Sequence, residues 1–231
     1  MQLEEYKMAY FSDRVDAGKR LASALKDFAG KKGVVLAIPR GGVVVGFEIA
    51  MALRLPLDVI IPHKLGAPGN PELAIGAVAE DGTMILDDNL IDYMGVSRDY
   101  IRAEAEHQKQ EIQRRLKLYR QDAPYPNLKG LDVVVVDDGI ATGSTMKAAL
   151  ASVRNRDAAT VIVAVPVGPP STIIELKKQA DRVVCLHTPE YFQAIGQFYT
   201  DFSQTTDEEV IQLLKENRQS LSRKPTGMAV V

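Results

Sequence analysis

The chain has 231 residues, of which 46% are hydrophobic and 25% charged, and its formal net charge is -2. These values are typical of a soluble globular protein with one substantial core. The small charge argues against nucleic-acid and membrane partners, because both require a basic field. The sequence contains neither an apolar run near the roughly 20 residues of a membrane span nor a signal peptide. One cysteine, Cys185, cannot form an internal disulfide, which favours a reducing, cytoplasmic location.

The first half of the chain predicts helices alternating with strands, followed by a loop and a hairpin. Capping residues before helically spaced apolar residues indicate helices, and β-branched runs that end at prolines indicate strands. The predicted elements are a helix over 12–29, a strand over 34–38, a helix over 43–53 and a strand over 58–62. Segment KLGAPGNPEL (64–73) holds two glycines and two prolines, which predicts a mobile loop. Asp81-Gly82 predicts the turn of a hairpin over 74–86.

The second half predicts a long polar helix and then a regular α/β alternation. The helix covers 97–121 and is capped by Ser97. Its narrow apolar stripe consists of Ile101, Ala105, Ile112, Leu116 and Tyr119. The later elements are strands over 132–136, 160–165 and 182–187 and helices over 143–154 and 171–179. The pattern predicts an α/β fold with a doubly wound, mostly parallel sheet covered on both faces.

We expect one domain over residues 1–231, because no repeat or linker divides the chain. Its core covers about 12–187, and residues after Pro166 close over one edge. The last dozen residues, 220–231, carry no pattern and predict a loose tail.

The segment VVVVDDGIATGST (133–145) is the most informative stretch of the sequence. Ligands of open α/β sheets bind beyond the carboxyl ends of the strands, where Asp137 and Asp138 are expected. The small residues that follow let backbone N–H groups converge at a helix N-terminus, which suits a phosphate monoester. The phosphate loop comprises Gly139, Ala141, Thr142, Gly143, Ser144 and Thr145. Paired aspartates would repel a phosphate, so they indicate acceptors for two neighbouring hydroxyls or distant partners of a hydrated Mg²⁺.

Other interpretations of this stretch explain less. The sequence contains no GxxxxGK[ST] motif and no GxGxxG after a strand, which excludes the common nucleotide-binding loops. In a purely structural interpretation, Asp138 caps a helix and Asp137 ends a strand, which would suffice for an isolated pair of acids. A phosphate at one end and a cis-diol at the other describe a ribose 5-phosphate.

VVVVDDGIATGST resembles the phosphoribosyl pyrophosphate (PRPP) binding signature of the type I phosphoribosyltransferases. The resemblance implies that Asp137 and Asp138 hold the ribose hydroxyls, with any metal reached only through water or ribose. It also implies that residues 141–145 hold the 5-phosphate and that Mg²⁺ is the cofactor. In relatives an acid shortly after the paired aspartates often lies near the acceptor. Here that stretch holds only Ile140 and Ala141, which leaves the general base unidentified.

The resemblance implies a second loop for the pyrophosphate of PRPP, made by Pro39, Arg40, Gly41 and Gly42. The glycines let the backbone approach a ligand, and Arg40 offers a forked charge for phosphate oxygens. Alone, this segment would be a plain strand-to-helix turn. Residues 64–73 fall where the family carries a flexible lid, and Lys64 is the second expected pyrophosphate cation. Arg40 and Lys64 are thus the expected catalytic residues.

The resemblance also implies a C-terminal hood, over about 167–215, that covers a nucleobase. The aromatic residues proposed to contact the acceptor are Phe192, Phe198 and Tyr199, although most aromatics at such spacing belong to a core. The likeness covers roughly residues 10–215 and is strongest to stand-alone bacterial and archaeal members. It implies transfer of the 5-phosphoribosyl group to a nitrogen base with Mg²⁺-dependent release of pyrophosphate, and a homodimer.

Two alternatives remain open at this point. A regulatory protein could sense PRPP or a nucleotide on the same fold without efficient transfer. One that binds nucleic acid should show a basic face, and the nearest such group lies at the end of the long helix: Arg114, Arg115, Lys117 and Arg120. A phosphosugar hydrolase or isomerase would need a catalytic base or metal cluster, which three histidines do not suggest.

Overall fold

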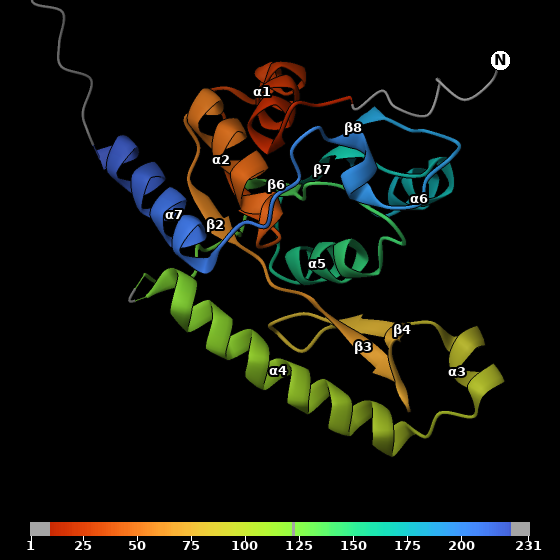
Figure 1. The fold of residues 1–231 in the computed structure, drawn as a ribbon. Coiled ribbons are helices and arrows are strands. Elements are labelled where there is room, and N and C mark those ends of the chain that lie inside the picture. The colour runs from red at the N-terminus through yellow and green to blue at the C-terminus, as the bar shows by residue number, and fades with distance from the viewer. Residues whose placement is uncertain (1–9, 122, 223–231) are drawn as a thin grey trace, which may run out of the picture.

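The computed structural model describes residues 10–121 and 123–222 and is built around a five-stranded parallel sheet (Figure 1). The strand order is β2-β1-β6-β7-β8. The bounds are β1 (Gly33–Ala37), β2 (Leu57–Val59), β6 (Asp132–Val136), β7 (Thr160–Val167) and β8 (Arg182–His187). Each adjacent pair is parallel, with Val35 opposite Val134 and Val134 opposite Ile162. The predicted α/β fold with a parallel sheet is confirmed.

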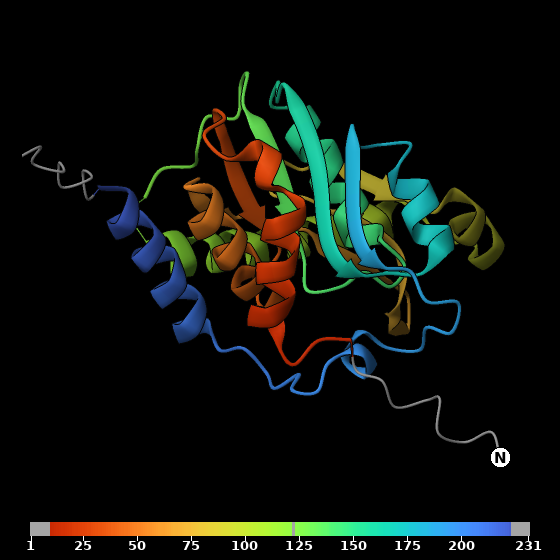
Figure 2. The same ribbon diagram turned by 90° about the horizontal axis from the view of Figure 1, so that it is seen from above.

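Helices cover both faces of this sheet, as Figure 2 shows for the face that carries α1 and α2. Helices α1 (Arg14–Ala24) and α2 (Gly41–Leu53) lie there, and a 3₁₀ turn, η2 (Lys26–Phe28), follows α1. Helices α5 (Ser144–Arg154) and α6 (Pro170–Leu176) pack on the opposite face. Alternate residues of one strand point to opposite faces, so β1, β6, β7 and β8 each contribute to two separate apolar clusters.

A second, three-stranded antiparallel sheet lies between α5 and the long helix α4 (Arg98–Arg120) (Figure 1). Its strands are β3 (His63–Ala67), β4 (Asn70–Val78) and β5 (Met84–Leu86). The prediction of a loop over 64–73 is therefore wrong for most of its length. The glycine at position 66 lets β3 and β4 pack closely and does not mark a mobile loop, since a Cβ on Gly66 would lie 2.8 Å from Pro71 Cα. The hairpin turn is confirmed, with Gly82 at φ +85°.

Helix α4 confirms the sequence prediction almost residue for residue. Ser97 is its N-cap and accepts a hydrogen bond from Tyr100 N. All five residues of the predicted apolar stripe are buried. The preceding helix α3 (Asp88–Met94) was not predicted, although it carries the usual signals. Asp87 caps it by accepting from Leu90 N, and Gly95 ends it at φ +63°.

The C-terminal segment leaves β8, runs along the sheet edge through a 3₁₀ turn, η3 (Ile195–Phe198), and ends in α7 (Asp207–Ser222). Thr206 and Glu209 form a capping box: Glu209 N donates to Thr206 Oγ1, and Thr206 N donates to Glu209 Oε2. Buried Asn217 accepts from Leu57 N and donates to Leu55 O. These anchors extend the helix to residue 222, so the tail predicted from 220 is wrong for 220–222. Residues 223–231 lie outside the described residues.

Among residues 10–121 and 123–222, no helix combines the length and the hydropathy needed to cross a membrane.

Candidate functional site

Two loops meet at the carboxyl edge of the parallel sheet. The first, residues 39–42, follows β1, and the second, residues 137–143, follows the neighbouring β6. Ile38 N donates to Val136 O, which carries the strand pairing up to the loops. A Cβ on Gly41 would overlap Asp138 Oδ2, and a Cβ on Gly42 would lie 2.9 Å from Asp137 Cα. Glycine is therefore required at both positions by the contact with the paired aspartates.

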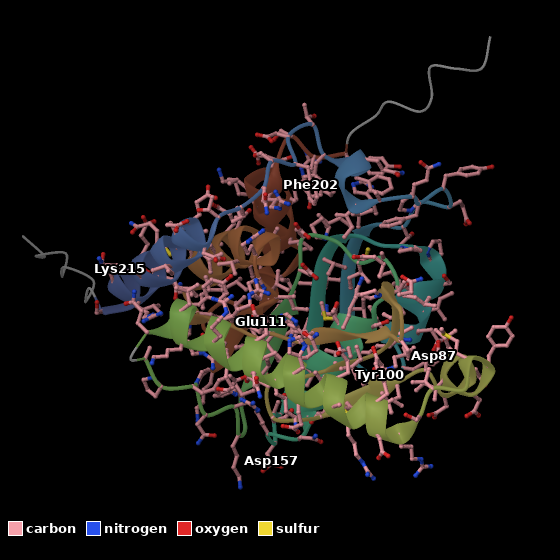
Figure 3. All side chains as sticks on the ribbon, turned by 60° about the horizontal axis from the view of Figure 1, so that its bottom comes forward. Asp87, Tyr100, Glu111, Asp157, Phe202 and Lys215 are labelled. Atoms are coloured by element: carbon pink, nitrogen blue, oxygen red, sulfur yellow. The ribbon has the colours of Figure 1, made fainter. Side chains whose placement is uncertain are left out.

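The Asp138 side chain is fixed by a residue that sequence reasoning missed. Arg14 Nε, at the start of α1, donates to Asp138 Oδ2 at 2.7 Å, and the two side chains are 11% and 13% exposed. Arg14 also donates to Ser203 O and lies 3.8 Å from the centroid of the Phe202 ring. Figure 3 shows Phe202 on the C-terminal segment beside α1. These contacts form a clamp, in which Arg14 holds the Asp138 carboxylate and the C-terminal segment holds Arg14.

Asp137 has a different electrostatic environment. Burial, followed by the negative charge of Asp138, raises the pKa of Asp137 well above its usual range. Its Oδ1 accepts a hydrogen bond from Asp138 N at 2.8 Å. The two aspartates are therefore unequal: Asp138 has a permanent cationic partner, whereas Asp137 lacks an ion-pair partner among the described residues.

The following loop, from Gly139 to Thr145, is held open by contacts with neighbouring segments. Ile140 N donates to Val167 O of β7, and Thr172 Oγ1 donates to Ala141 O at 2.8 Å. Gly143 has φ +78° and precedes the first residue of α5. Ala141 and Thr142 are exposed, and the hydroxyls of Thr142 and Ser144 lie 3.3 Å apart. Backbone and hydroxyl donors gathered at a helix N-terminus suit an anion.

The two expected cations lie on different supports. Arg40 follows a cis Pro39–Arg40 peptide bond, and its Nη1 lies 3.7 Å from Asp207 Oδ1 at the start of α7. Lys64 is exposed on β3, where it pairs with Ala77 of β4. The aspartates, the hydroxyl-rich loop and Arg40 belong to one sheet edge, whereas Lys64 belongs to the second sheet.

Comparison with known proteins shows the family to which the chain belongs. The family model of the phosphoribosyl transferase domain matches residues 12–203. The chain belongs to this family. A Mycobacterium tuberculosis protein named "putative phosphoribosyl transferase" is 46% identical over 209 residues, which are 90% of this chain and 47% of that protein. The chain thus spans about half the length of the curated relatives it matches.

A solved structure shares the fold of this chain over most of its length. The crystal structure of TT1426 from Thermus thermophilus is 45% identical to this chain, with a TM-score of 0.77. The match covers 89% of this chain and 98% of that one. The fold is thus shared across most of both chains.

In this phosphoribosyl transferase fold, the three aromatic residues expected at the acceptor have unequal access to solvent. Phe198 and Tyr199 are each 5% exposed and pack in a small cluster with Phe11. The Tyr199 hydroxyl donates to Asp138 O at 2.6 Å, so this side chain holds the backbone of Asp138 in place. Phe192 is only partly buried and packs against Phe198. Ile195 closes over Gly139, where a Cβ would lie 2.5 Å from its side chain.

The carboxylates of the site suit a metal ion that is held mainly by the bound substrate. Among residues 10–121 and 123–222, no three acidic, histidine or cysteine side chains gather as a metal cage. Asp137 still offers carboxylate oxygens of the kind Mg²⁺ prefers. Its raised pKa favours the protonated form, and a nearby cation would lower that pKa and favour the ionised form. This chemistry fits indirect contact through water or ribose hydroxyls.

The basic group at the end of α4 does not form a free basic face. Arg114 donates two hydrogen bonds to Glu111, which Figure 3 labels on this helix. Buried Arg120 donates to Asp58, and Arg115 donates to Tyr119. Most of the charge is neutralised or directed inward, which removes the main support for a nucleic-acid-binding regulator.

Proposed function

We propose that the protein transfers the 5-phosphoribosyl group of PRPP to a nitrogen acceptor, most simply a nucleobase, and releases pyrophosphate with Mg²⁺. The observation that supports this proposal best is the contact between the two loops, with Gly41 against Asp138 and Gly42 against Asp137. PRPP carries a phosphate at C5 and a pyrophosphate at C1 of one ribose. A ligand of that shape can engage both loops at once with its hydroxyls over the aspartates.

The proposed roles follow from the placement of each group. Donors from Gly139 to Thr145 bind the 5-phosphate, and Asp137 and Asp138 accept from the ribose hydroxyls. Arg14 occupies one oxygen of Asp138, and the remaining acceptor positions of that carboxylate serve the sugar. Arg40, with the backbone of residues 39–42, and Lys64 bind the pyrophosphate. Of the three aromatic residues expected at the acceptor, Phe192 is the best placed to contact it, because Phe198 and Tyr199 are buried.

In the proposed reaction the bond between C1 and the pyrophosphate oxygen breaks, and a bond from C1 to the acceptor nitrogen forms with inversion. The proton of the nitrogen passes to water or to the released pyrophosphate, on which negative charge accumulates as it leaves. Arg40 and Lys64 stabilise that charge. Bound Mg²⁺, held by Asp137 and Asp138 through water or ribose, would supply further charge neutralisation. Movement of the β3–β4 hairpin over the site would exclude water and suppress PRPP hydrolysis.

Calorimetric titration with PRPP and Mg²⁺ tests the binding site. We expect binding by the wild-type protein and its loss in Asp137→Asn/Asp138→Asn. Asp132→Asn is the matched control, because Asp132 lies at the amino end of the same strand, away from the two loops. Equal binding by all three proteins would contradict the assignment of the aspartates, provided that circular dichroism shows each of them to be folded.

A pyrophosphate-release assay with a panel of purines and pyrimidines tests the transfer step. Release with one base supports the transferase and identifies its acceptor. Tight PRPP binding without release for any base would instead favour the regulatory alternative.

We further propose that the protein forms a homodimer. Exposed apolar side chains gather around α3 and β5, where Met84, Tyr93 and Met94 are 41%, 89% and 37% exposed. Light scattering coupled to gel filtration measures the mass directly, and a monomer at micromolar concentration would contradict the proposal.

A further inference from the structure

Arg40, the cation of the proposed pyrophosphate loop, faces a carboxylate that comes from a distant part of the chain. Asp207 is the first residue of α7, and its Oδ1 lies 3.7 Å from Arg40 Nη1. Both side chains are about one-third exposed, at 34% and 35%. The separation exceeds hydrogen-bonding distance, so Asp207 attracts the guanidinium without occupying its N–H groups. Those donors remain available for phosphate oxygens.

Asp207 is itself held in place by the long helix. The Tyr119 hydroxyl donates to Asp207 Oδ1 at 2.5 Å, and Arg115 Nη2 donates to the same hydroxyl at 3.0 Å. Arginine can only donate, so the phenol accepts from Arg115 and must give its proton to Asp207. Tyr119 is 1% exposed, and α4 packs against α7 at this point. The carboxylate oxygen that faces Arg40 therefore has a fixed position.

The same residues of α4 also reach the strand that carries the second expected cation. Arg115 Nη1 lies 3.3 Å from His63 Nε2, and His63 Nδ1 lies 2.8 Å from Gln108 Oε1. An Nε2 that accepts from Arg115 requires the proton on Nδ1, which then donates to Gln108. His63 directly precedes Lys64 on β3. One run of side chains thus joins the Arg40 loop to the Lys64 strand, which belong to different sheets (Figure 1).

We propose that Asp207, Tyr119 and Arg115 form a brace that positions Arg40 for the pyrophosphate of PRPP and links it to the strand of Lys64. The proposal rests on the proposed function and extends it to residues outside the two loops. Asp207 acts through Arg40 and is a positioning residue. Its negative charge orders the guanidinium before the ligand arrives, and this preorganisation strengthens binding at the pyrophosphate end. Within the described part of the chain, no hydrogen bond or ion pair joins the 5-phosphate loop to the brace.

The test compares two ligand fragments in Asp207→Asn, which removes the charge and keeps an oxygen that can accept from Tyr119. Calorimetry with Mg²⁺-pyrophosphate is expected to show about tenfold weaker binding, equivalent to about 1.4 kcal/mol. Binding of ribose 5-phosphate is expected to stay unchanged. With PRPP and an acceptor, we expect KM for PRPP to rise more than kcat falls.

Glu208→Gln is the matched control, because Glu208 is the next residue of α7, is exposed and carries the same charge. Both substitutions remove one negative charge from the first turn, so their effects on the helix dipole are alike. Tyr119→Phe is expected to weaken pyrophosphate binding in the same direction, by a smaller factor. Thermal unfolding of each variant checks that the fold is retained.

The proposal is overturned if Asp207→Asn binds pyrophosphate as tightly as the wild type, because the carboxylate would then have no role in binding. Tighter binding would also overturn it, because the carboxylate would then compete with the ligand. An equal loss in Glu208→Gln, or an equal loss for ribose 5-phosphate, would also overturn it. A wild-type protein that binds neither PRPP nor pyrophosphate would refute the proposed function, and with it the role toward pyrophosphate. The ¹⁵N relaxation of the Arg40 Nε–H group, assigned with Arg40→Lys, then separates the two failures. If the Arg40 side chain becomes mobile in Asp207→Asn but stays ordered in Glu208→Gln, the brace still anchors Arg40. If the Arg40 side chain is equally ordered in Asp207→Asn and the wild type, the brace itself is refuted.

Discussion

The two loops at the edge of the parallel sheet are adjacent but are held in different ways. Residues 137–145 are supported by groups within hydrogen-bonding distance, such as Arg14, Thr172 and Tyr199. The side chain of Arg40 instead has one charged neighbour, Asp207, and no hydrogen bond within the described part of the chain. The difference indicates a rigid loop at the proposed ribose-phosphate end and an adjustable loop at the proposed pyrophosphate end. Under the proposed function, a site that binds PRPP and later releases pyrophosphate would benefit from that division.

The largest effect is expected from removing Arg14, which should break the rigid end. Arg14→Leu leaves the Asp138 carboxylate without its partner, and losing one partner of a buried pair costs about 3 kcal/mol. Chemical denaturation measures the free energy of unfolding, and Asp138→Asn in the same chain should restore part of it. Arg102→Leu, which removes an exposed pair with Asp99, is the control and should change little. Equal stability of the Arg14 and Arg102 variants would show that the clamp is not structural.

A smaller effect is expected at Asn217, which anchors α7 and therefore Asp207. Asn217→Ala leaves Leu57 N and Leu55 O buried without their side-chain partner, at a cost of about 2 kcal/mol. We expect weaker binding of Mg²⁺-pyrophosphate and unchanged binding of ribose 5-phosphate in calorimetry. Gln212→Ala, on the exposed side of the same helix, should affect neither ligand. Loss of both ligands in Asn217→Ala would remove the distinction between the two ends.

Thr172 offers a finer test of the rigid end. Thr172→Val removes the hydrogen bond to Ala141 O and should cost about 1 kcal/mol. Ribose 5-phosphate should bind more weakly, because its loop loses one support, whereas pyrophosphate should bind as before. Calorimetry with both fragments provides the comparison. A loss confined to pyrophosphate would assign the loops the other way round.

The smallest expected effect is a change in pH dependence at His63. Burial lowers the pKa of His63, the positive charge of Arg115 adds to this, and Gln108 and Glu111 oppose it. The unfolded chain therefore binds a proton here at a higher pH than the folded protein does. Stability should be greatest above about pH 6.5 and should fall as the pH drops through that value. His63→Gln should flatten this part of the profile in thermal unfolding, and an unchanged slope would contradict the assignment.

Local patterns predicted the strand, loop and helix start around residues 133–145 well. The four valines, two acids and small residues of 133–145 encode a strand, its end and a loop within one short segment, so periodicity and composition suffice. The stripe of α4 was predictable for the same reason, because helical spacing marks its buried face. Helices α3 and α7 carry capping signals at Asp87 and Thr206 that a closer reading would have found.

The remaining features depend on contacts between distant segments. Nothing near Arg14 in the sequence indicates that it meets Asp138, 124 positions away. The glycines and prolines of 64–73 suggested a loop, yet Gly66 is small because Pro71 packs against it across a strand pair. The pairing of Arg40 with Asp207 likewise arises only once α7 has docked.

The course of the segment between β8 and α7 has a consequence for how the protein is made. Thr200 N and Asp201 N donate to Phe11 O and Ser12 O, Tyr199 supports Asp138, and Asp207 faces Arg40. Residues 199–207 are synthesised after Asp138, from which they are separated by more than fifty positions. The parallel sheet can assemble while they are still being synthesised, but neither end of the site can be completed. A nascent chain that stops before residue 195 would therefore display the binding motif without a finished site.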